Sequence, residues 1–384
     1  MNFELSEEQN IALDAWRGFI AREIAPITND YRETPIPHDV AVQLLKKSIP
    51  YGVGAGWFPE DIGGTGLDQV TSGLLYEELA VVSPDYAGLA FINEGVGLSL
   101  HALGSPELQA RYLGPLLKGD LVGCSAITEP GVGSNVRGVK TRAVRDGDGY
   151  RLSGEKTWIS NGDIADISVV IAHTTEETGE EAISMFLVDR HEHGFESRNL
   201  EKLGLNGWPT SQLFFDDVFI PAANLLGKPG GGLKETLRLF ERARCYVGLI
   251  STGIARAALE AAIQYATERE QWGKKIAGHQ MIQNMIAEMA TELECARLLC
   301  FQGLALVDRG GRCDTQTSMA KYYATEAAVR IASNAIQIHG AMGLSKELPS
   351  EWYFRNARMM TIPDGTSQIQ KLIIARNLLG VSAF

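Results

Sequence analysis

The 384-residue sequence predicts a mainly helical α+β protein with an N-terminal α-helical domain, a middle antiparallel β domain and a C-terminal four-helix bundle. Two observations carry this prediction. Helical periodicity gives way near Leu121 to short β-rich runs, and it returns after Gly230-Gly231-Gly232. No long helix separates the β-rich runs, which disfavours a doubly wound parallel sheet. The predicted domains are residues 1–120, 121–228 and 229–384.

The N-terminal domain opens with a helix start signal. Ser6 and Gln9 form a capping-box pattern, and apolar residues then recur on one helical face from Ile11 to Ile20. Ser83-Pro84 and Ser105-Pro106 each place a cap residue before a proline, which suits the first turn of a helix. These signals predict an all-helical first domain.

The middle domain contains six β-rich runs separated by turn residues such as Asp-Gly and Asn161-Gly162. The predicted strands are 121–128, 138–145, 149–160, 166–173, 183–189 and 212–219. Their spacing is typical of an antiparallel sheet or a small barrel.

The C-terminal domain shows four helical segments. They are a long amphipathic helix over about 233–263, a helix over 280–308, a helix from the cap Asp314 to Gly340, and a last one over about 364–380. Short connections between them predict a bundle.

Composition excludes several classes of function. The net charge of −12 argues against nucleic-acid binding, which needs a basic surface. Charged residues interrupt every apolar run before about 18 residues, so we expect no membrane span. The acidic, helical N-terminus resembles neither a secretory signal nor a transit peptide, which predicts a cytoplasmic protein. Five cysteines without a CxxC pair are interpreted as ordinary buried thiols. We expect no metal site, because His191-Glu192-His193 lacks a third ligand nearby.

Four segments carry candidate chemistry. They are the Gly-rich turn 127–135 (ITEPGVGSN), the strand end 156–162 (KTWISNG), the segment 268–280 (EREQWGKKIAGHQ) and the turn 362–370 (IPDGTSQIQ). Each has an ordinary explanation when taken alone: a loop, a core aromatic, a surface ion pair, and an Asx turn or helix cap. No phosphate-binding P-loop, complete GxGxxG or HExxH motif is present.

Together, and in this order, the four segments resemble the acyl-CoA dehydrogenase family over nearly the whole chain. Leu203-Gly204 and the segment 215–218 (FDDV) extend the resemblance. It implies the same three-part fold, FAD bound between the β and C-terminal domains, a homotetramer, and electron-transferring flavoprotein as electron acceptor.

The resemblance also implies roles for individual residues. The residues expected to contact FAD are Thr128, Trp158, Ser160, Arg269, Trp272, Gln280, Gln337, Gly340, Thr366 and Gln368. Those expected to contact the substrate are Ser134, Arg244 and Gly365. Arg269, Trp272 and Gln280 are expected to reach the cofactor partly across a subunit interface.

Asp364 is the predicted catalytic base, which would remove the Cα proton of an acyl-CoA while flavin N5 takes the Cβ hydride. Most relatives have Glu here, and Asp is shorter by one methylene, or about 1.5 Å. Ala243 occupies the alternative base position of some relatives, and Glu241 would face roughly 200° away on a helix. Pro363 and Asn135 also depart from the family pattern. The short base suggests a cyclic or branched acyl group.

Two alternatives stay open from the sequence. A flavin oxidase acting on an acyl-CoA or a nitroalkane would pass electrons to O₂ and produce H₂O₂. A non-catalytic flavin-binding protein would share the fold, but the intact Thr128, Trp158, Arg269, Asp364 and Thr366 argue against it.

Overall fold

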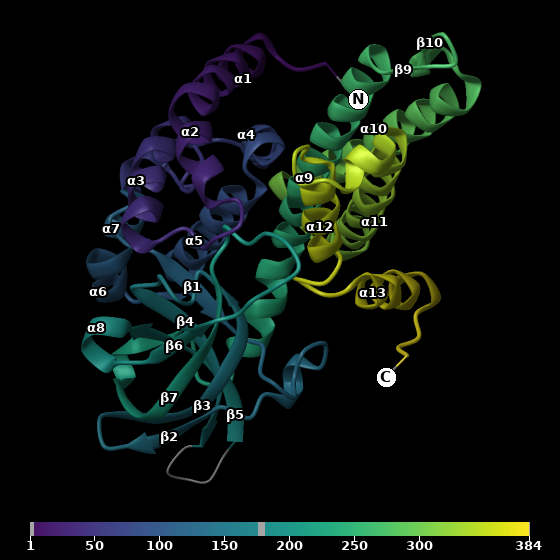
Figure 1. The fold of residues 1–384 in the computed structure, drawn as a ribbon. Helices are drawn as coiled ribbons and strands as arrows, with labels where there is room; N and C mark the ends of the chain where they lie inside the picture. The colour runs from purple at the N-terminus through teal and green to yellow at the C-terminus, as the bar shows by residue number, and fades with distance from the viewer. Residues whose placement is uncertain (1–3, 176–180, 384) are drawn as a thin grey trace.

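A computed structural model describes residues 4–175 and 181–383 of the chain. N-terminal helices lie on one side, a twisted sheet lies below them, and a long helical bundle extends away from the sheet (Figure 1). The predicted fold class is confirmed. The domain boundaries at 120 and 228 stay a prediction.

The N-terminal helices begin where the sequence places caps. Helix α1 (Glu7–Phe19) has the Ser6–Gln9 capping box, and a π-turn and α2 (Ala25–Thr28) continue it. Ser83 and Ser105 cap the helices that start at Pro84 and Pro106. The remaining helices are α3 (His38–Ser48), α4 (Gln69–Val82), α5 (Pro84–Leu103), α6 (Pro106–Leu108) and α7 (Gly114–Leu117).

The middle region forms an eight-stranded sheet in the order β6-β7-β3-β2-β4-β5-β8, with β1 paired to β4. Its strands are β1 (Gly123–Ala126), β2 (Arg142–Asp146), β3 (Gly149–Ser160), β4 (Ile167–Thr175), β5 (Glu181–Asp189), β6 (Glu196–Asn199), β7 (Thr210–Pro221) and β8 (Leu225–Leu226). The prediction of a purely antiparallel sheet is wrong at one strand, because β4 pairs in parallel with both β1 and β2. Alternation of apolar residues cannot reveal strand direction, since both kinds of pairing share the period of two.

The C-terminal region contains α9 (Gly232–Glu268), α10 (Gln280–Asp308), α11 (Asp314–His339), α12 (Ser350–Met360) and α13 (Ser367–Leu379). Helices α9, α10 and α11 pack on one another, and α12 packs against α9 and α11. Helix α13 contacts α11 but projects away from the bundle (Figure 1).

Two details of the predicted bundle are therefore wrong. The fourth bundle helix is α12, which is only 11 residues long and gave no cap signal, whereas α13 begins at Ser367 with Thr366 as its cap. Asp314 is the first residue of α11, and Cys313 occupies the cap position.

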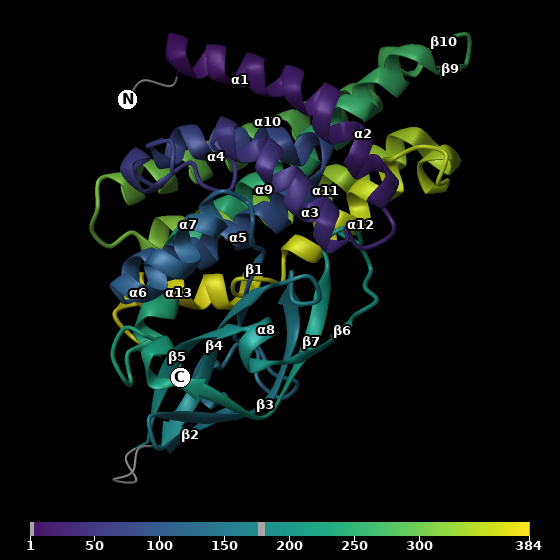
Figure 2. The ribbon, with the colours of Figure 1, turned by 90° about the vertical axis from the view of Figure 1, so that its left-hand side faces the viewer.

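Helix α9 is the central helix of the molecule. It packs against α4 and α5 on one side and against α10, α11 and α12 on the other, and Figure 2 shows it behind the N-terminal helices. By length and composition it could cross a membrane, but 78% of its apolar window is buried inside the protein. This burial is what a core helix requires.

Close packing between α9 and α4 depends on Gly253. A Cβ built there would lie 2.6 Å from the Ala80 Cβ and 2.7 Å from the Glu77 carbonyl oxygen. Gly253→Ala should therefore destabilise the protein by about 1–3 kcal/mol, because one of the two backbones must shift. The midpoint of thermal unfolding measures this. Gly114→Ala is the control, since nothing lies within 4 Å of its Cβ position, and a lower midpoint in that variant as well would contradict the packing argument.

Candidate active site

A cavity of about 670 Å³ lies where α5, the sheet, α9 and the turn between α12 and α13 meet. Most of its lining is apolar. Eight of the residues predicted from the sequence line it: Thr128, Ser134, Trp158, Ser160, Arg244, Asp364, Gly365 and Thr366. Segments more than 200 residues apart in the sequence thus meet at one site.

Asp364 is the only carboxylic acid among the residues that line this cavity. Its φ of 53° lies in the left-handed region, which few non-glycine residues adopt. Burial in the cavity raises the pKa of Asp364, and the nearby charges of Lys321 and Arg244 oppose that rise. The side chain is half-buried and accepts no hydrogen bond from any residue that the structure describes. A carboxylate with a raised pKa and free oxygens is suited to accept a proton.

Two buried side chains hold the turn that displays Asp364. Lys321 Nζ donates to the carbonyl oxygens of Thr361 at 3.0 Å and Gly365 at 2.9 Å. Gln370 Nε2 donates to the carbonyl oxygens of Asp364 and Gly365, both at 3.0 Å. Neither Lys321 nor Gln370 exposes any surface. Because Lys321 and Gln370 fix its carbonyl groups, the turn can maintain the unusual φ of Asp364.

Sequence analysis missed Lys321, although a signal for it exists. Lys321 lies on the helical stripe of Thr317, Ala324 and Ala328, all of which are buried. A lysine on such a stripe must have partners within the protein. Burial lowers the pKa of Lys321 to about 8, and the carboxylates of Asp364 and Glu326 oppose this.

Arg244 provides a buried cation beside the base. The residue is 6% exposed, and its Nε and Nη1 atoms have no hydrogen-bond partner among the described residues. Burial lowers the pKa of Arg244, while Glu241, Asp314 and Asp364 oppose that effect. Unpaired N–H groups that line a cavity are ready to bind an oxygen atom of a ligand.

On the sheet side of the cavity, a bulge in β3 presents Trp158. Register against β7 shifts between Lys156 and Ile159, and Trp158 has a φ of 59°. A bulge inserts an extra residue and redirects a side chain. Trp158 remains 54% exposed, and its ring makes no contact with another aromatic side chain in the described part of the chain.

A buried ion pair joins the two segments that carry Thr128 and Trp158. Lys156 Nζ donates to Glu129 Oε1 at 2.8 Å and to the Ile127 carbonyl oxygen at 3.0 Å. Glu129 also accepts from the main-chain N–H of Thr141 at 2.9 Å. Burial lowers the pKa of Lys156 to about 8 against the influence of Glu129. The Thr157 N–H donates to the Thr128 carbonyl oxygen at 2.9 Å, so main-chain and side-chain bonds both connect the two segments.

Asn161 fixes the end of the same strand. Its Nδ2 donates to the carbonyl oxygens of Leu89 at 3.0 Å and Gly123 at 3.1 Å, and its Oδ1 accepts from Trp208 Nε1 at 3.0 Å. The predicted Asn161-Gly162 turn therefore ties the sheet to α5. Trp208 lines the cavity, and the sequence gave no indication of this.

The other predicted cofactor residues lie outside the cavity. Arg269, Trp272, Gln280, Gln337, Gly340 and Gln368 are all exposed. The first three surround the hairpin of β9 (Glu270–Gln271) and β10 (Lys274–Lys275), at the opposite end of the bundle from the sheet (Figure 1). Contact between the rings of Tyr265 and His339 places the end of α11 at the same location. Helix α11 spans 26 residues, so this end lies roughly 40 Å along the helix from its start.

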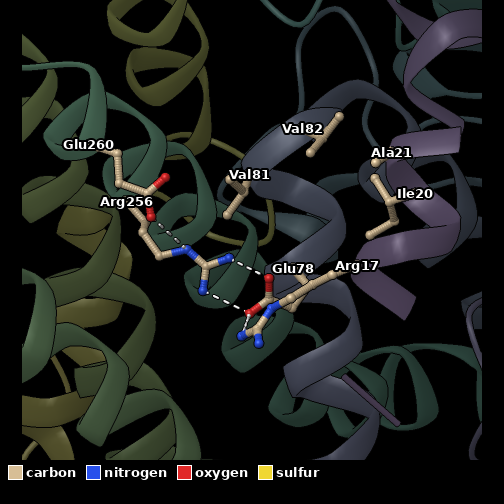
Figure 3. Close-up of a pocket in the computed structure, with 8 residues that line it drawn as sticks. All are labelled: Arg17, Ile20, Ala21, Glu78, Val81, Val82, Arg256 and Glu260. Atoms are coloured by element: carbon tan, nitrogen blue, oxygen red, sulfur yellow. Dashed lines mark hydrogen bonds and ion pairs between the residues drawn. The ribbon is translucent and has the colours of Figure 1, made fainter. Parts of the chain in front are cut away.

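A second cavity, of about 370 Å³, lies between α1, α4 and α9 (Figure 3). Its charged groups neutralise one another, because two acids face two arginines: Glu78 accepts from Arg17 at 2.7 Å and from Arg256 at 2.6 Å, and Glu260 pairs with Arg256 at 3.8 Å. Burial opposes ionisation, but these two arginines lower the pKa of Glu78 to about 2. The cluster links three helices and offers no free group suited to catalysis.

Two minor predictions from the sequence are wrong in part. Four of the cysteines are buried as predicted, but Cys295 is exposed. His191, Glu192 and His193 form the short helix α8 (Arg190–His193) instead of a turn, and Glu192 pairs with Arg111. Among the described residues, no group of three or more His, Cys, Asp or Glu side chains is arranged to hold a metal ion.

Comparison with known proteins shows the class of protein. Residues 6–120, 124–218 and 230–379 match the N-terminal, middle and C-terminal domains of acyl-CoA dehydrogenases. The chain belongs to the acyl-CoA dehydrogenase family, whose members are FAD-dependent oxidoreductases.

Individual relatives cover almost the whole chain. An acyl-CoA dehydrogenase of Bacillus subtilis is 37% identical over 98% of this chain and 99% of its own length. Cyclohex-1-ene-1-carbonyl-CoA dehydrogenase of Syntrophus aciditrophicus is also 37% identical, over 98% and 91%. The solved structure of glutaryl-CoA dehydrogenase with glutaryl-CoA has a TM-score of 0.93 at 35% identity, covering 99% of this chain and 97% of that one.

The cavity suits the ring system of FAD. Trp158 offers an uncovered flat apolar surface, and the hydroxyl groups of Thr128 and Ser160 line the same side. Aromatic faces and a few placed polar groups are typical of cofactor sites.

Lys156→Met should disrupt the side of the cavity that Thr128, Trp158 and Ser160 line. It leaves the buried Glu129 without its cationic partner, which costs about 3–5 kcal/mol, and it loosens the attachment of the segment that carries Trp158. We expect a lower unfolding midpoint and weaker retention of FAD, measured by heating and by the flavin absorbance after gel filtration. The control is Lys140→Met, which changes an exposed lysine near the same loop. Equal loss of FAD in both variants would contradict a specific role for the ion pair.

Proposed function

We propose that this enzyme removes two hydrogens from the Cα–Cβ bond of an acyl-CoA thioester, with Asp364 as the base. The observation that carries the proposal is the position of Asp364 as the single acid lining the cavity. Ala243 also lines the cavity, but its methyl group cannot accept a proton. Glu241, the other acid considered, is absent from the lining and instead accepts from the Cys313 thiol at 3.8 Å.

The chain's own groups would assist the proton transfer. Proton removal places negative charge on the thioester oxygen, which donors in a dry site stabilise strongly. The main-chain N–H of Asp364 makes no hydrogen bond within the described residues and can serve as one such donor. Arg244 and Ser134 would bind the CoA portion, and Gly365 would leave room beside the base. Thr128, Trp158, Ser160 and Thr366 would hold FAD, which would supply the hydride acceptor.

The acyl group is proposed to be cyclic or branched. Asp364 is shorter than Glu by one methylene, about 1.5 Å, so the carboxylate lies further back and a bulkier Cα substituent fits in front of it. Pro363 stiffens the backbone just before the base. A relative that acts on cyclohex-1-ene-1-carbonyl-CoA supports this substrate class.

A second copy of the chain is proposed to complete the cofactor site. Arg269, Trp272, Gln280, Gln337 and Gly340 lie far from the cavity, and Trp272 is 93% exposed. A neighbouring subunit can bring such a group to the FAD of this chain, as in the homotetramer expected from the sequence. Gln368 would contact the cofactor from the first turn of α13. The cytoplasmic location stays a prediction.

Electron-transferring flavoprotein is the proposed electron acceptor. Two relatives are named with it: a caffeyl-CoA reductase–Etf complex subunit and a structure from a study of an electron transferring flavoprotein. The oxidase alternative predicts rapid H₂O₂ formation in air when substrate is added. We expect slow H₂O₂ formation and fast reduction of the flavoprotein, and a peroxide assay beside a flavoprotein-reduction assay separates the two.

Asp364→Asn should slow anaerobic bleaching of the flavin by about 10²–10⁴-fold, because the amide cannot accept the Cα proton. FAD content should be unchanged. Stopped-flow absorbance with a panel of straight, branched and cyclic acyl-CoAs measures the rate. An unchanged rate in a variant that retains FAD would show that Asp364 is not the base.

Asp364→Glu tests the substrate class. The added methylene should favour straight-chain over cyclic acyl-CoAs relative to the natural enzyme, because the carboxylate then extends further into the cavity. The ratio of kcat/KM values for a straight and a cyclic thioester is the measurement. An unchanged ratio would show that the length of the base does not determine which acyl group the enzyme prefers.

Lys321→Met should move the acid limb of the kcat/KM profile to higher pH. The base acts when deprotonated, so the rate falls as pH falls through the pKa of Asp364. The Lys321 charge lowers that pKa, as does Arg244, and removing one of them raises it. The limb must be recorded well below pH 8, where Lys321 is protonated.

Gln370→Leu is the matched control for this experiment. It removes two hydrogen bonds from the same turn without changing a charge. We expect a lower rate, but the acid limb of the kcat/KM profile should lie at the same pH as in the natural enzyme. The same displacement of the limb in both variants would mean that turn geometry, not the lysine charge, sets the pKa of the base.

A further inference from the structure

Helix α9 presents different arginines to two sides of the cavity. Arg242 and Arg244 both line it, but two residues along a helix correspond to a rotation of about 200°. Arg244 lies near Asp364 and Asp314. Arg242 instead faces α4 and α5, where it contacts Gln69 and Glu94. The wall formed by α5 and this side of α9, with α4 packed behind it and contributing no lining residue, is here called the α4–α5 wall.

Arg242 is neutralised by a fully buried carboxylate. Its guanidinium forms an ion pair with Glu94, which is 0% exposed, and Glu94 also accepts from Tyr76 Oη at 2.7 Å. Arg242 Nε donates to Gln69 Oε1 at 2.6 Å, and its guanidinium lies 4.1 Å from the centre of the Tyr246 ring. Asp308, which accepts from the Gln69 N–H, is a further acidic group nearby. Arg242 reaches the cavity, whereas Glu94 is not part of its lining.

The remainder of the α4–α5 wall is mostly apolar, with Phe91, Leu98, Val247 and Ile250 in the lining. The third cation of the cavity, Lys202, already donates to the Trp208 carbonyl oxygen at 2.7 Å. Lys202 lies on the segment between β6 and β7, outside α5 and α9. Of the described lining residues on α5 and on this side of α9, Arg242 is therefore the one cation that could receive an anionic acyl group, and Glu94 is already paired with it.

We propose that Glu94 is a specificity-determining residue: by neutralising Arg242 it makes the α4–α5 wall accept uncharged acyl groups and reject those ending in a carboxylate. The inference rests on the proposed function, because it assumes that an acyl group reaches this wall. A carboxylate entering an apolar wall loses its hydration and needs a free partner. Arg242 could be that partner only without Glu94. Glutaryl-CoA, the ligand of one solved relative, should therefore be a poor ligand here.

Pentanoyl-CoA and glutaryl-CoA are the probes, because they have the same number of acyl carbons and differ in the terminal group. With the holoenzyme, rates come from anaerobic bleaching of the flavin and affinities from perturbation of its absorbance. The natural enzyme should favour pentanoyl-CoA by at least about 100-fold. Glu94→Gln should reduce this preference at least about 10-fold, by improving the use of glutaryl-CoA.

Two further variants isolate the charge. Glu77→Gln is the matched control, since Glu77 is a buried carboxylate of α4 paired with Arg297 at 2.9 Å and does not line the cavity. It should leave the preference unchanged. The double variant Glu94→Gln/Arg242→Met removes the released positive charge and should restore the preference for pentanoyl-CoA.

Equal use of the two thioesters by the natural enzyme overturns the proposal, even if Glu94→Gln fails to fold. So does a Glu94→Gln protein that holds FAD and keeps the original preference. Failure of the proposed function would look different: no acyl-CoA would bleach the flavin in any variant. The ratio of the affinities for pentanoyl-CoA and glutaryl-CoA would then still show whether the α4–α5 wall rejects a terminal carboxylate.

Discussion

Two hydrogen bonds from the buried Lys321 to the turn after α12 are the constraint on which the candidate site depends. The turn must hold Asp364 at a positive φ with its carboxylate directed into the cavity and its main-chain N–H unoccupied. A short loop with this backbone is strained, and the carbonyl groups must be fixed from outside it. Lys321 and Gln370 do so from two helices, so the position of the base depends on how α11 and α13 pack.

Buried charges follow one pattern around the cavity. Lys156 pairs with Glu129, Arg242 with Glu94, and Lys321 with main-chain carbonyl groups. Arg244 and Asp364 are the exceptions among the charged residues that the structure describes in the cavity lining, because the Arg244 Nε and Nη1 atoms and the Asp364 carboxylate oxygens have no protein partner. A buried polar atom left unpaired is costly unless a ligand satisfies it. These two residues therefore mark where a polar ligand should bind.

The paired charges still influence binding, although they do not act on a ligand directly. Glu129 and Lys156 connect the Gly-rich turn to the bulged strand, which sets the position of the Trp158 ring. Glu94 removes the attraction that Arg242 would have for an anion. The same type of interaction thus fixes the Trp158 side of the cavity in one place and neutralises a cation of the α4–α5 wall in another.

The sequence alone determined the order of the three regions, because helical and strand periodicities differ and cap residues such as Ser6, Ser83 and Ser105 mark helix starts. Eight of the residues named from its motifs lie among those that line the cavity. Only the tertiary structure revealed the parallel pairing of β4, the bundle position of α12 and the partners Lys321 and Glu94. The reason is physical: periodicity reports which face of an element is buried, but not which distant element covers it. Hydrogen bonds such as that between Lys321 and Gly365 join residues 44 positions apart and exist only once the helices have packed.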